Sequence, residues 1–492
     1  MRILFSVCIM LLTLTVTAQK GLPEDFLSSE FHKNRREALR GKMPENSVAV
    51  FFSNPVRNRA NDVDYVYHQD PNFYYLTGYK EPHAVLVIFS EHQTNSEGKR
   101  YNEILYVQER NARAEQWTGY RLGVEGAKEQ LGFEMAFNGK EFLESGIDFT
   151  SFDSVLYFDF KDDYRDSKRN TADLYSLIQS FKQQIHVLEA FDIDNKKDQI
   201  EEEQDTQVLQ SKVKTDTRTL GRLMAGLREV KTDEEMVLLK KAVRISAMGQ
   251  REIMKAMHPN MSETEVQGVH EYVYKKYGSE YEGYPSIVGA GHNGCVLHYI
   301  ENNKTKLGND LVLMDLGAEY HGYTADVTRT IPANGKFSKE QKQIYDLVYE
   351  AQEAGINATI VGNSTRDTDA ASREIINKGL VKLGIAKNEA DARQYFPHGT
   401  SHHIGLDVHD TNLRGAFVPN MVITVEPGIY IPEGSDCDEK WWGIAVRIED
   451  DILITENGPI NLSAEAPRKS DEIEALMKEE SVLSGLQLPK LD

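Results

Sequence analysis

Cysteine, basic charge and long apolar runs are all scarce in this sequence, and each shortage excludes a class of protein. Three cysteines occur in 492 residues, and the two beyond the N-terminal segment, Cys295 and Cys437, are far apart and do not make a disulfide scaffold. Lysine and arginine number 56 against 77 aspartates and glutamates, a net charge of −21. Such acidity argues against binding to nucleic acid or an anionic membrane, because both reward basic patches. Beyond the N-terminal segment, no stretch is long and apolar enough to cross a membrane.

The first residues have the pattern of an export signal. Arg2 precedes an apolar run that continues to about Val16, and small residues follow as far as Ala18. The run is short for a membrane span, so we predict a cleaved signal peptide over residues 1–18, with a buried N-terminal strand as the alternative. The mature protein is then expected to be periplasmic or extracellular, with no membrane attachment.

The rest of the chain has a globular composition, with 40% apolar and 27% charged residues, and it is longer than one hydrophobic core usually organises. Strand-like runs at 48–52 and 84–89, separated by helical patches, predict an α/β first domain over residues 22–190. A polar, charge-rich stretch follows, and we interpret residues 191–228 as a linker or helical connection.

A second domain is predicted over residues 229–480. Thr232, Ser262 and Ser338 each precede a glutamate or glutamine by three residues, which is the spacing of a helix capping box. A further helix is expected near residues 372–383. The order of helix, helix and strands occurs twice, which indicates internal pseudo-symmetry. The fold class is therefore α/β (α+β).

Two aspartates stand inside apolar, strand-like sequence, where an uncompensated carboxylate is costly. A tight turn centred between Tyr320 and His321 would place Asp315 directly opposite Asp326. Their carboxylates could then reach two cations about 3.5–4 Å apart. The alternative is a pair of aspartates at a surface turn.

Further candidate ligands lie downstream. Residues 398–410 contain four of the chain's 14 histidines, either around a metal site or in a histidine-rich surface loop. Glu426 and Glu449 also lie in apolar, strand-like sequence. Strand alternation places Arg447 on the same face as Glu449, where it could orient the carboxylates or simply form a buried ion pair. A donor set of oxygens with one imidazole and no thiolate suits manganese, cobalt or zinc better than copper or an iron–sulfur cluster.

These residues, taken in order, resemble the five-ligand dinuclear site of the pita-bread metallopeptidases, which include methionine aminopeptidase, prolidase and aminopeptidase P. The matching ligands are Asp315, Asp326, His402, Glu426 and Glu449. Segments 68–79 and 117–123 look like the N-terminal domain of aminopeptidase P and prolidase, so the resemblance covers nearly the whole mature chain. It implies an aminopeptidase P-type domain followed by a pita-bread catalytic domain.

The resemblance also implies two divalent metal ions, with manganese as first choice and cobalt or zinc as alternatives. Asp326 and Glu449 would bridge both ions, Asp315 would hold one, and His402 with Glu426 would hold the other. A hydroxide between the ions is the implied nucleophile. The implied roles of the remaining residues are proton transfer by Glu426, contact with the substrate and its oxyanion by His298 and His409, and a proline pocket at His398, Tyr430 and Arg447.

The implied reaction removes the first residue from peptides that carry proline at position two. Prolidase, which cuts only the Xaa-Pro dipeptide, is the nearest alternative, and a non-catalytic binding protein on the same fold is another. The presence of all five ligands disfavours the latter and creatinase-like, metal-independent hydrolysis. Methionine aminopeptidase normally lacks such a first domain. The resemblance further implies a homo-oligomer, a dimer or tetramer. His403 stands where several relatives have a bulky apolar residue, which makes the pocket shape an open question.

Overall fold

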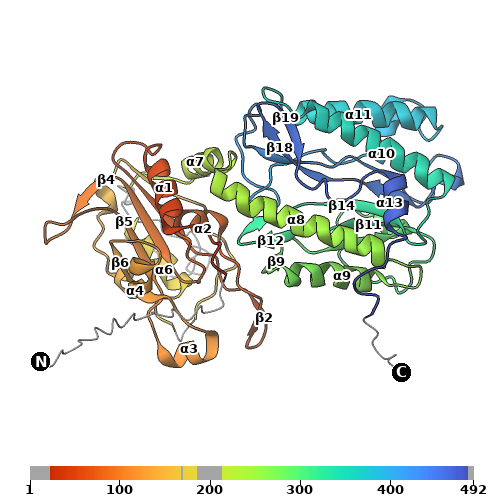
Figure 1. The fold of residues 1–492 in the computed structure, drawn as a ribbon. Helices are drawn as coiled ribbons and strands as arrows, with labels where there is room; N and C mark the ends of the chain where they lie inside the picture. Colours follow the sequence, from red (N-terminus) through yellow and green to blue (C-terminus); the bar gives the residue numbers. More distant parts are fainter. Residues whose placement is uncertain (1–22, 168–169, 186–212, 486–492) are drawn as a thin grey trace, which may run out of the picture.

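The computed structural model describes residues 23–167, 170–185 and 213–485, so the predicted signal peptide lies outside the described residues. The chain forms two lobes, joined where α7 (Thr219–Arg228) leads into the long helix α8 (Asp233–Ala256) (Figure 1). None of the described helices is both long and apolar enough to cross a membrane.

The first lobe is built on a six-stranded mixed sheet with strand order β6-β5-β4-β1-β7-β8. Its strands are β1 (Ser47–Phe52), β4 (Val85–Thr94), β5 (Arg100–Val107), β6 (Ala136–Asn138), β7 (Ser154–Tyr157) and β8 (Thr215–Asp216). Its helices are α1 (Ser29–Arg40), α2 (Pro71–Thr77), α3 (Ala112–Thr118), α4 (Gly123–Glu129), α5 (Gly139–Leu143) and α6 (Leu174–Gln184), and β2 (Asn58–Ala60) pairs with β3 (Val63–Asp64) in a small hairpin.

Both faces of this sheet are covered, because alternate residues of its central strands enter different cores. On β1, Ala49 and Phe51 belong to the core shared with the second lobe, whereas Val48 and Val50 face the core formed with α5 and α6. Strand β8 pairs in parallel with β7, so the sheet extends to residue 216, past the boundary predicted at 190. The predicted connection, 191–228, is described only from 213 onward, where it contains β8 and α7.

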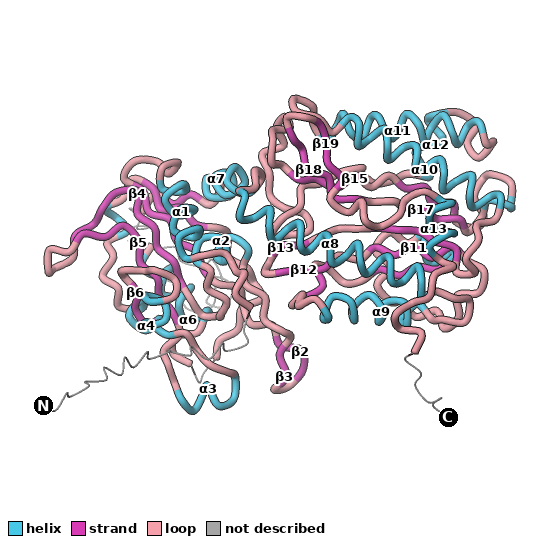
Figure 2. Tube along the Cα trace, viewed as in Figure 1, coloured by secondary structure: helices cyan, strands magenta, loops and turns pink. Residues whose placement is uncertain are grey.

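The second lobe places its strands between the helices α8 and α9 on one side and α10 and α11 on the other (Figure 2). The helices are α9 (Glu263–Lys276), α10 (Lys339–Ala358), α11 (Thr365–Lys382), α12 (Glu389–Ala392) and α13 (Ser470–Leu476). The strands are β9 (Tyr281–Glu282), β10 (Ile287–Ala290), β11 (Leu311–Asp315), β12 (Ala318–Tyr320), β13 (Tyr323–Thr324), β14 (Thr328–Pro332), β15 (Val422–Val425), β16 (Gly428–Ile431), β17 (Ile444–Arg447), β18 (Asp450–Thr455) and β19 (Gly458–Asn461). The predicted repetition is present: α8 and α9 precede strands β9–β14, and α10 and α11 precede strands β15–β19.

The predicted helix starts are largely confirmed. Thr232 and Ser338 form reciprocal capping boxes with Glu235 and Gln341. Ser262 accepts the backbone N–H of Glu265, which is half of the predicted box. Helix α11 begins at Thr365, earlier than the predicted start near 372, because a capping box at Ser364 starts it there.

The predicted register of the ligand hairpin is wrong by one position in the turn. His321 and Gly322 form the turn, with φ of 50° and 90°, and positive φ at both central residues is what a type I′ turn requires. Tyr320 therefore pairs with Tyr323, and Asp315 pairs with Thr328 and not with Asp326. Because Asp326 precedes Thr328 by two residues, strand alternation still places it on the same side as Asp315.

Candidate metal centre

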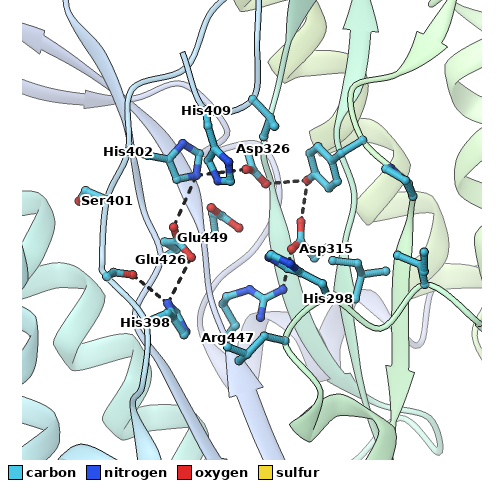
Figure 3. Close-up of a pocket in the computed structure, with 17 residues that line it drawn as sticks. His298, Asp315, Asp326, His398, Ser401, His402, His409, Glu426, Arg447 and Glu449 are labelled. Atoms are coloured by element: carbon cyan, nitrogen blue, oxygen red, sulfur yellow. Dashed lines mark hydrogen bonds and ion pairs between the residues drawn. The ribbon is translucent and has the colours of Figure 1, made fainter. Parts of the chain in front are cut away.

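All five candidate ligands line one pocket of about 510 Å³ in the second lobe (Figure 3). The prediction that residues spread over 135 positions of sequence gather in one place is therefore confirmed for Asp315, Asp326, His402, Glu426 and Glu449. His298, His398, His409 and Arg447 line the same pocket, together with apolar side chains that include Leu297, Ile300 and Val408.

Asp315 ends strand β11 and forms an ion pair with Arg447, which ends β17. The Arg447 Nη2 donates to Asp315 Oδ2 at 2.6 Å, as expected for an arginine that orients a carboxylate. Burial alone would raise the pKa of Asp315, but the Arg447 charge and the hydrogen bonds from Tyr284 and Arg447 lower it below its ordinary value. Asp315 is thus held as a carboxylate facing the pocket.

Asp326, His402 and Glu449 present the tightest group of donor atoms, all within 4.8 Å of one another. The His402 Nε2 lies 3.5 Å from Asp326 Oδ2. Burial raises the pKa of Asp326 well above its ordinary value, and the neighbouring Asp315 adds to the shift. Burial, followed by the charge of Asp326, has the same effect on the pKa of Glu449.

Glu426 directly follows β15 and lies between two histidines. Its Oε1 is 3.5 Å from His402 Nε2, and its Oε2 is 3.5 Å from His398 Nδ1. Burial raises the pKa of Glu426 to about 7, which leaves the side chain able to accept or release a proton near neutral pH.

The donor set fits divalent metal ions. Four buried or half-buried carboxylates converge on the pocket, and Arg447 is the one lysine or arginine among the residues that line it. The raised pKa values of Asp326, Glu426 and Glu449 have burial as their largest cause, with repulsion from neighbouring carboxylates also contributing, and bound cations would relieve both. Hard oxygen donors with one imidazole are the ligands that manganese, cobalt and zinc accept.

Three residues that sequence reasoning missed hold the candidate ligands in place. The Tyr284 Oη lies 2.6 Å from both Asp315 Oδ1 and Asp326 Oδ1. Thr328 donates its hydroxyl to Glu449 Oε2 at 2.6 Å, and the Asp326 backbone N–H donates to Asp451 Oδ2 at 3.1 Å. The run of three acids from Glu449 to Asp451 was a usable signal for Asp451, whereas no sequence pattern marks Tyr284 or Thr328.

The predicted proline-pocket residues form one polar cluster. The Tyr430 Oη lies 2.8 Å from His398 Nε2 and accepts a hydrogen bond from Arg447 Nη1 at 2.9 Å. His398 and Arg447 line the pocket, whereas Tyr430 is buried behind them and connects them.

The predicted substrate-contacting histidines both face the pocket. His409 packs edge-on against His402, with ring centroids 4.4 Å apart, and His298 lies on the side of Asp315 (Figure 3). Burial lowers the pKa of His409, which favours the neutral ring.

The structure answers the question raised by His403, because this side chain does not line the pocket. It is buried beside Lys231 and Asp410, and its backbone pairs with Ile423. Burial lowers its pKa to about 4, so the ring is neutral. The residue at position 403 therefore does not shape the pocket wall.

Comparison with known proteins covers both lobes. Residues 237–456 match the family model "Metallopeptidase family M24", and residues 32–148 match "Aminopeptidase P, N-terminal domain". The Xaa-Pro aminopeptidase of Escherichia coli (strain K12) is 36% identical over 464 residues, covering 92% of this chain and 98% of the relative. Xaa-Pro aminopeptidase 3 of Homo sapiens is 30% identical over 456 residues, covering 91% of this chain and 84% of the relative.

Solved structures show the same relationship. Aminopeptidase P from E. coli with the inhibitor Pro-Leu superimposes with a TM-score of 0.78 at 34% identity, covering 92% of this chain and 98% of that chain. A zinc-substituted form of the E. coli enzyme in complex with product matches with a TM-score of 0.77 and the same coverage.

Proposed function

This chain belongs to metallopeptidase family M24, in the group with the aminopeptidase P N-terminal domain, and we propose that it is a metal-dependent Xaa-Pro aminopeptidase. It would hydrolyse the peptide bond before proline and release the N-terminal residue of a peptide. The observation that carries the proposal is the convergence of five donor side chains on one pocket that is also lined by three further histidines and one arginine.

The five ligands would hold two divalent ions, with Asp326 and Glu449 shared between them, Asp315 on one, and His402 and Glu426 on the other. Two such ions lower the pKa of a water and polarise a carbonyl, which provides a nucleophile at neutral pH without a covalent enzyme intermediate. Manganese is the proposed resident metal, with cobalt or zinc as alternatives.

The protein groups then supply proton transfer and charge stabilisation. Glu426, with its pKa near 7, would take a proton from the attacking water and deliver it to the proline nitrogen as the bond breaks. His298 and His409 line the pocket and would donate hydrogen bonds to the oxygen on which negative charge develops. The cluster of His398, Tyr430 and Arg447 would form one wall around the proline ring.

A substrate comparison tests this function. We expect the purified protein to cleave Xaa-Pro-Yaa tripeptides, to lose activity when metal is removed by a chelator, and to recover it with Mn²⁺ or Co²⁺. Hydrolysis of Xaa-Pro dipeptides alone would instead identify a prolidase. Full activity in a preparation shown to be free of metal would contradict the proposed mechanism.

Tyr284 offers a more local test. Tyr284→Phe removes the hydroxyl that contacts Asp315 and Asp326 but keeps the ring, so the fold should be unchanged. Loss of a partner behind metal ligands typically weakens metal binding about 10- to 100-fold. Titrating metal-stripped protein with Mn²⁺ should show this weakening, and the matched variant Tyr281→Phe, whose hydroxyl donates to the Tyr67 carbonyl, should not. Equal affinities in the two variants would show that the Tyr284 hydroxyl does not position the ligands.

Export and self-association complete the proposal. The composition of residues 1–18 supports a cleaved signal peptide and a periplasmic or extracellular location, which N-terminal sequencing of the mature protein would test. The first lobe exposes large apolar side chains, including Trp117 (83% exposed) and Val66 (80%), which burial against a second copy would stabilise. Light scattering would distinguish a dimer or tetramer from a monomer.

A further inference from the structure

Two buried glutamines occupy equivalent places in the two halves of the second lobe. Gln250 lies on α8, the first helix of one half, and Gln352 lies on α10, the first helix of the other. Both have no exposed surface, and neither lines the pocket. Each points its side-chain amide at the strands that carry two of the four acidic ligands.

Gln250 joins the two strands of the aspartate hairpin. Its Nε2 donates to the Met314 carbonyl at 3.1 Å and to the Val327 carbonyl at 2.8 Å. Met314 directly precedes Asp315, and Val327 directly follows Asp326. The β11–β14 ladder ends at the pair Asp315 and Thr328, so the bridge lies where the two strands separate.

Gln352 makes the corresponding bridge for the two glutamates. Its Nε2 donates to the Val425 carbonyl at 3.1 Å and to Asp450 Oδ2 at 2.8 Å. Val425 directly precedes Glu426, and Asp450 directly follows Glu449. Val425 and Asp450 are the last pair of the β15–β18 ladder, so this bridge also lies where the strands separate.

The chemistry of the amide explains why glutamine suits both places. Buried acceptors at the end of a ladder need a donor, and an amide nitrogen carries two hydrogens, so one side chain can join two strands. Two acceptors on one side of the amide fix its orientation, with the NH₂ group toward them. The amide is also neutral, so it adds no charge behind an acidic site.

We propose that Gln250 and Gln352 are paired positioning residues for the metal centre. Gln250 sets the separation of Asp315 and Asp326, and Gln352 sets the separation of Glu426 and Glu449. The inference rests on the metal site proposed above. It assigns one glutamine bridge to each half of the pseudo-symmetric lobe. Removing either bridge should leave the helices in place but allow the two ligand strands to move apart.

The test compares metal binding by Gln250→Met, Gln352→Met and the unchanged full-length protein. Methionine keeps the length and burial of the side chain and removes both donors. Calorimetric titration of the metal-stripped proteins with Mn²⁺ should show about 10- to 100-fold weaker binding in each variant. Hydrolysis at ordinary Mn²⁺ should fall, and excess Mn²⁺ should restore most of it, because neither glutamine touches the substrate.

A matched control removes buried hydrogen bonds from the end of α10, the helix that carries Gln352, without touching the ligand strands. The Thr359 hydroxyl, at the end of α10, bonds only to Gly355 and Thr368 of α10 and α11 among the described residues. Thr359→Val should therefore lower thermal stability while leaving Mn²⁺ affinity unchanged. Should a methionine variant fail to fold, Gln→Asn at the same position keeps the donors on a shorter side chain and should still weaken binding.

The outcomes separate the two proposals. If the unchanged protein binds Mn²⁺ and the folded glutamine variants bind it equally well, the positioning role is wrong and the metal site stands. If the unchanged protein binds no divalent metal, the metal site itself is wrong, and the positioning role falls with it. Weakened binding in Thr359→Val to the same degree would also overturn the inference, because the effect would then be one of general stability.

Discussion

Replacing Asp326 by asparagine is expected to remove the bound metal and to lower kcat/KM by about 10³-fold or more. Asp326 is one of the two residues proposed to be shared between the ions, and loss of such a ligand costs several kcal/mol of transition-state stabilisation. An amide offers one neutral oxygen where the carboxylate offered two charged ones. Metal content measured by atomic emission, together with hydrolysis of a Xaa-Pro-Yaa peptide, checks both parts.

The same substitution should stabilise the metal-stripped protein, although it removes the metal and the activity. Burial and the charge of Asp315 make ionisation of Asp326 unfavourable in the folded state, and asparagine removes that cost. Asp326→Asn should therefore raise Tm in the presence of a chelator but lose the rise that Mn²⁺ gives the unchanged protein.

Glu319 offers a matched control from the same hairpin. It is a buried carboxylate that pairs with His68 and lies outside the metal pocket. Glu319→Gln should keep its metal. Normal metal content in Asp326→Asn would show that this residue is not a shared ligand.

The sequence pointed to the four acidic candidate ligands because each carboxylate stands in an unusual setting, whereas His402 was selected by the family resemblance. Asp315, Glu426 and Glu449 interrupt apolar, strand-forming runs, where a carboxylate is costly without a partner. The capping boxes at Thr232 and Ser338 were equally local, since cap and partner lie three residues apart. Patterns of this kind involve residues that are close in sequence, so they can be recognised without knowledge of the tertiary structure.

The hairpin register and the supporting residues depend on longer-range geometry. The turn is centred on His321 and Gly322 because Glu280, from outside the hairpin, accepts the His321 backbone N–H and contacts its ring. Tyr284 and Gln250 reach their targets across 31 or more positions of sequence, and neither residue type is unusual where it stands. Only the packing of α8 and the strands shows what these side chains do.

The metal-stripped protein is expected to become more stable as the pH falls from 8 to 6.5. Burial raises the pKa of Glu426 to about 7 and of Asp451 to about 8, and it raises those of Asp326 and Glu449 well above their ordinary values. A carboxyl group whose pKa is higher in the folded state binds its proton more tightly when folded. The stability that it contributes is therefore present at low pH and is lost as the pH rises through the folded pKa.

The same carboxyl groups determine the expected size of the stability change and the choice of the pH range. Each extra proton held by the folded state contributes about 1.4 kcal/mol per pH unit, so one proton over this window contributes about 2 kcal/mol. Buried histidines such as His32 and His270, whose pKa values are lowered by burial, act in the opposite direction as the unfolded ring takes up its proton around the ordinary pKa of 6.5, so the window ends there. Thermal unfolding in chelator at pH 8 and pH 6.5 should thus show the higher Tm at pH 6.5.

Bound metal should reverse this trend, because its ligands must be deprotonated to bind it. With Mn²⁺ present the protein should be at least as stable at pH 8 as at pH 6.5, so the metal-induced rise in Tm grows with pH. The variant with both Glu426→Gln and Asp451→Asn controls for the chain's overall acidity, because it keeps the surface charges, removes the two carboxyl groups whose pKa values are about 7 and about 8, and should flatten the chelator profile. A Tm in chelator that is constant or rises between pH 6.5 and 8 would mean that burial and mutual repulsion do not raise the pKa values of these carboxylates in the folded protein, and the physical case for cations between them would fail.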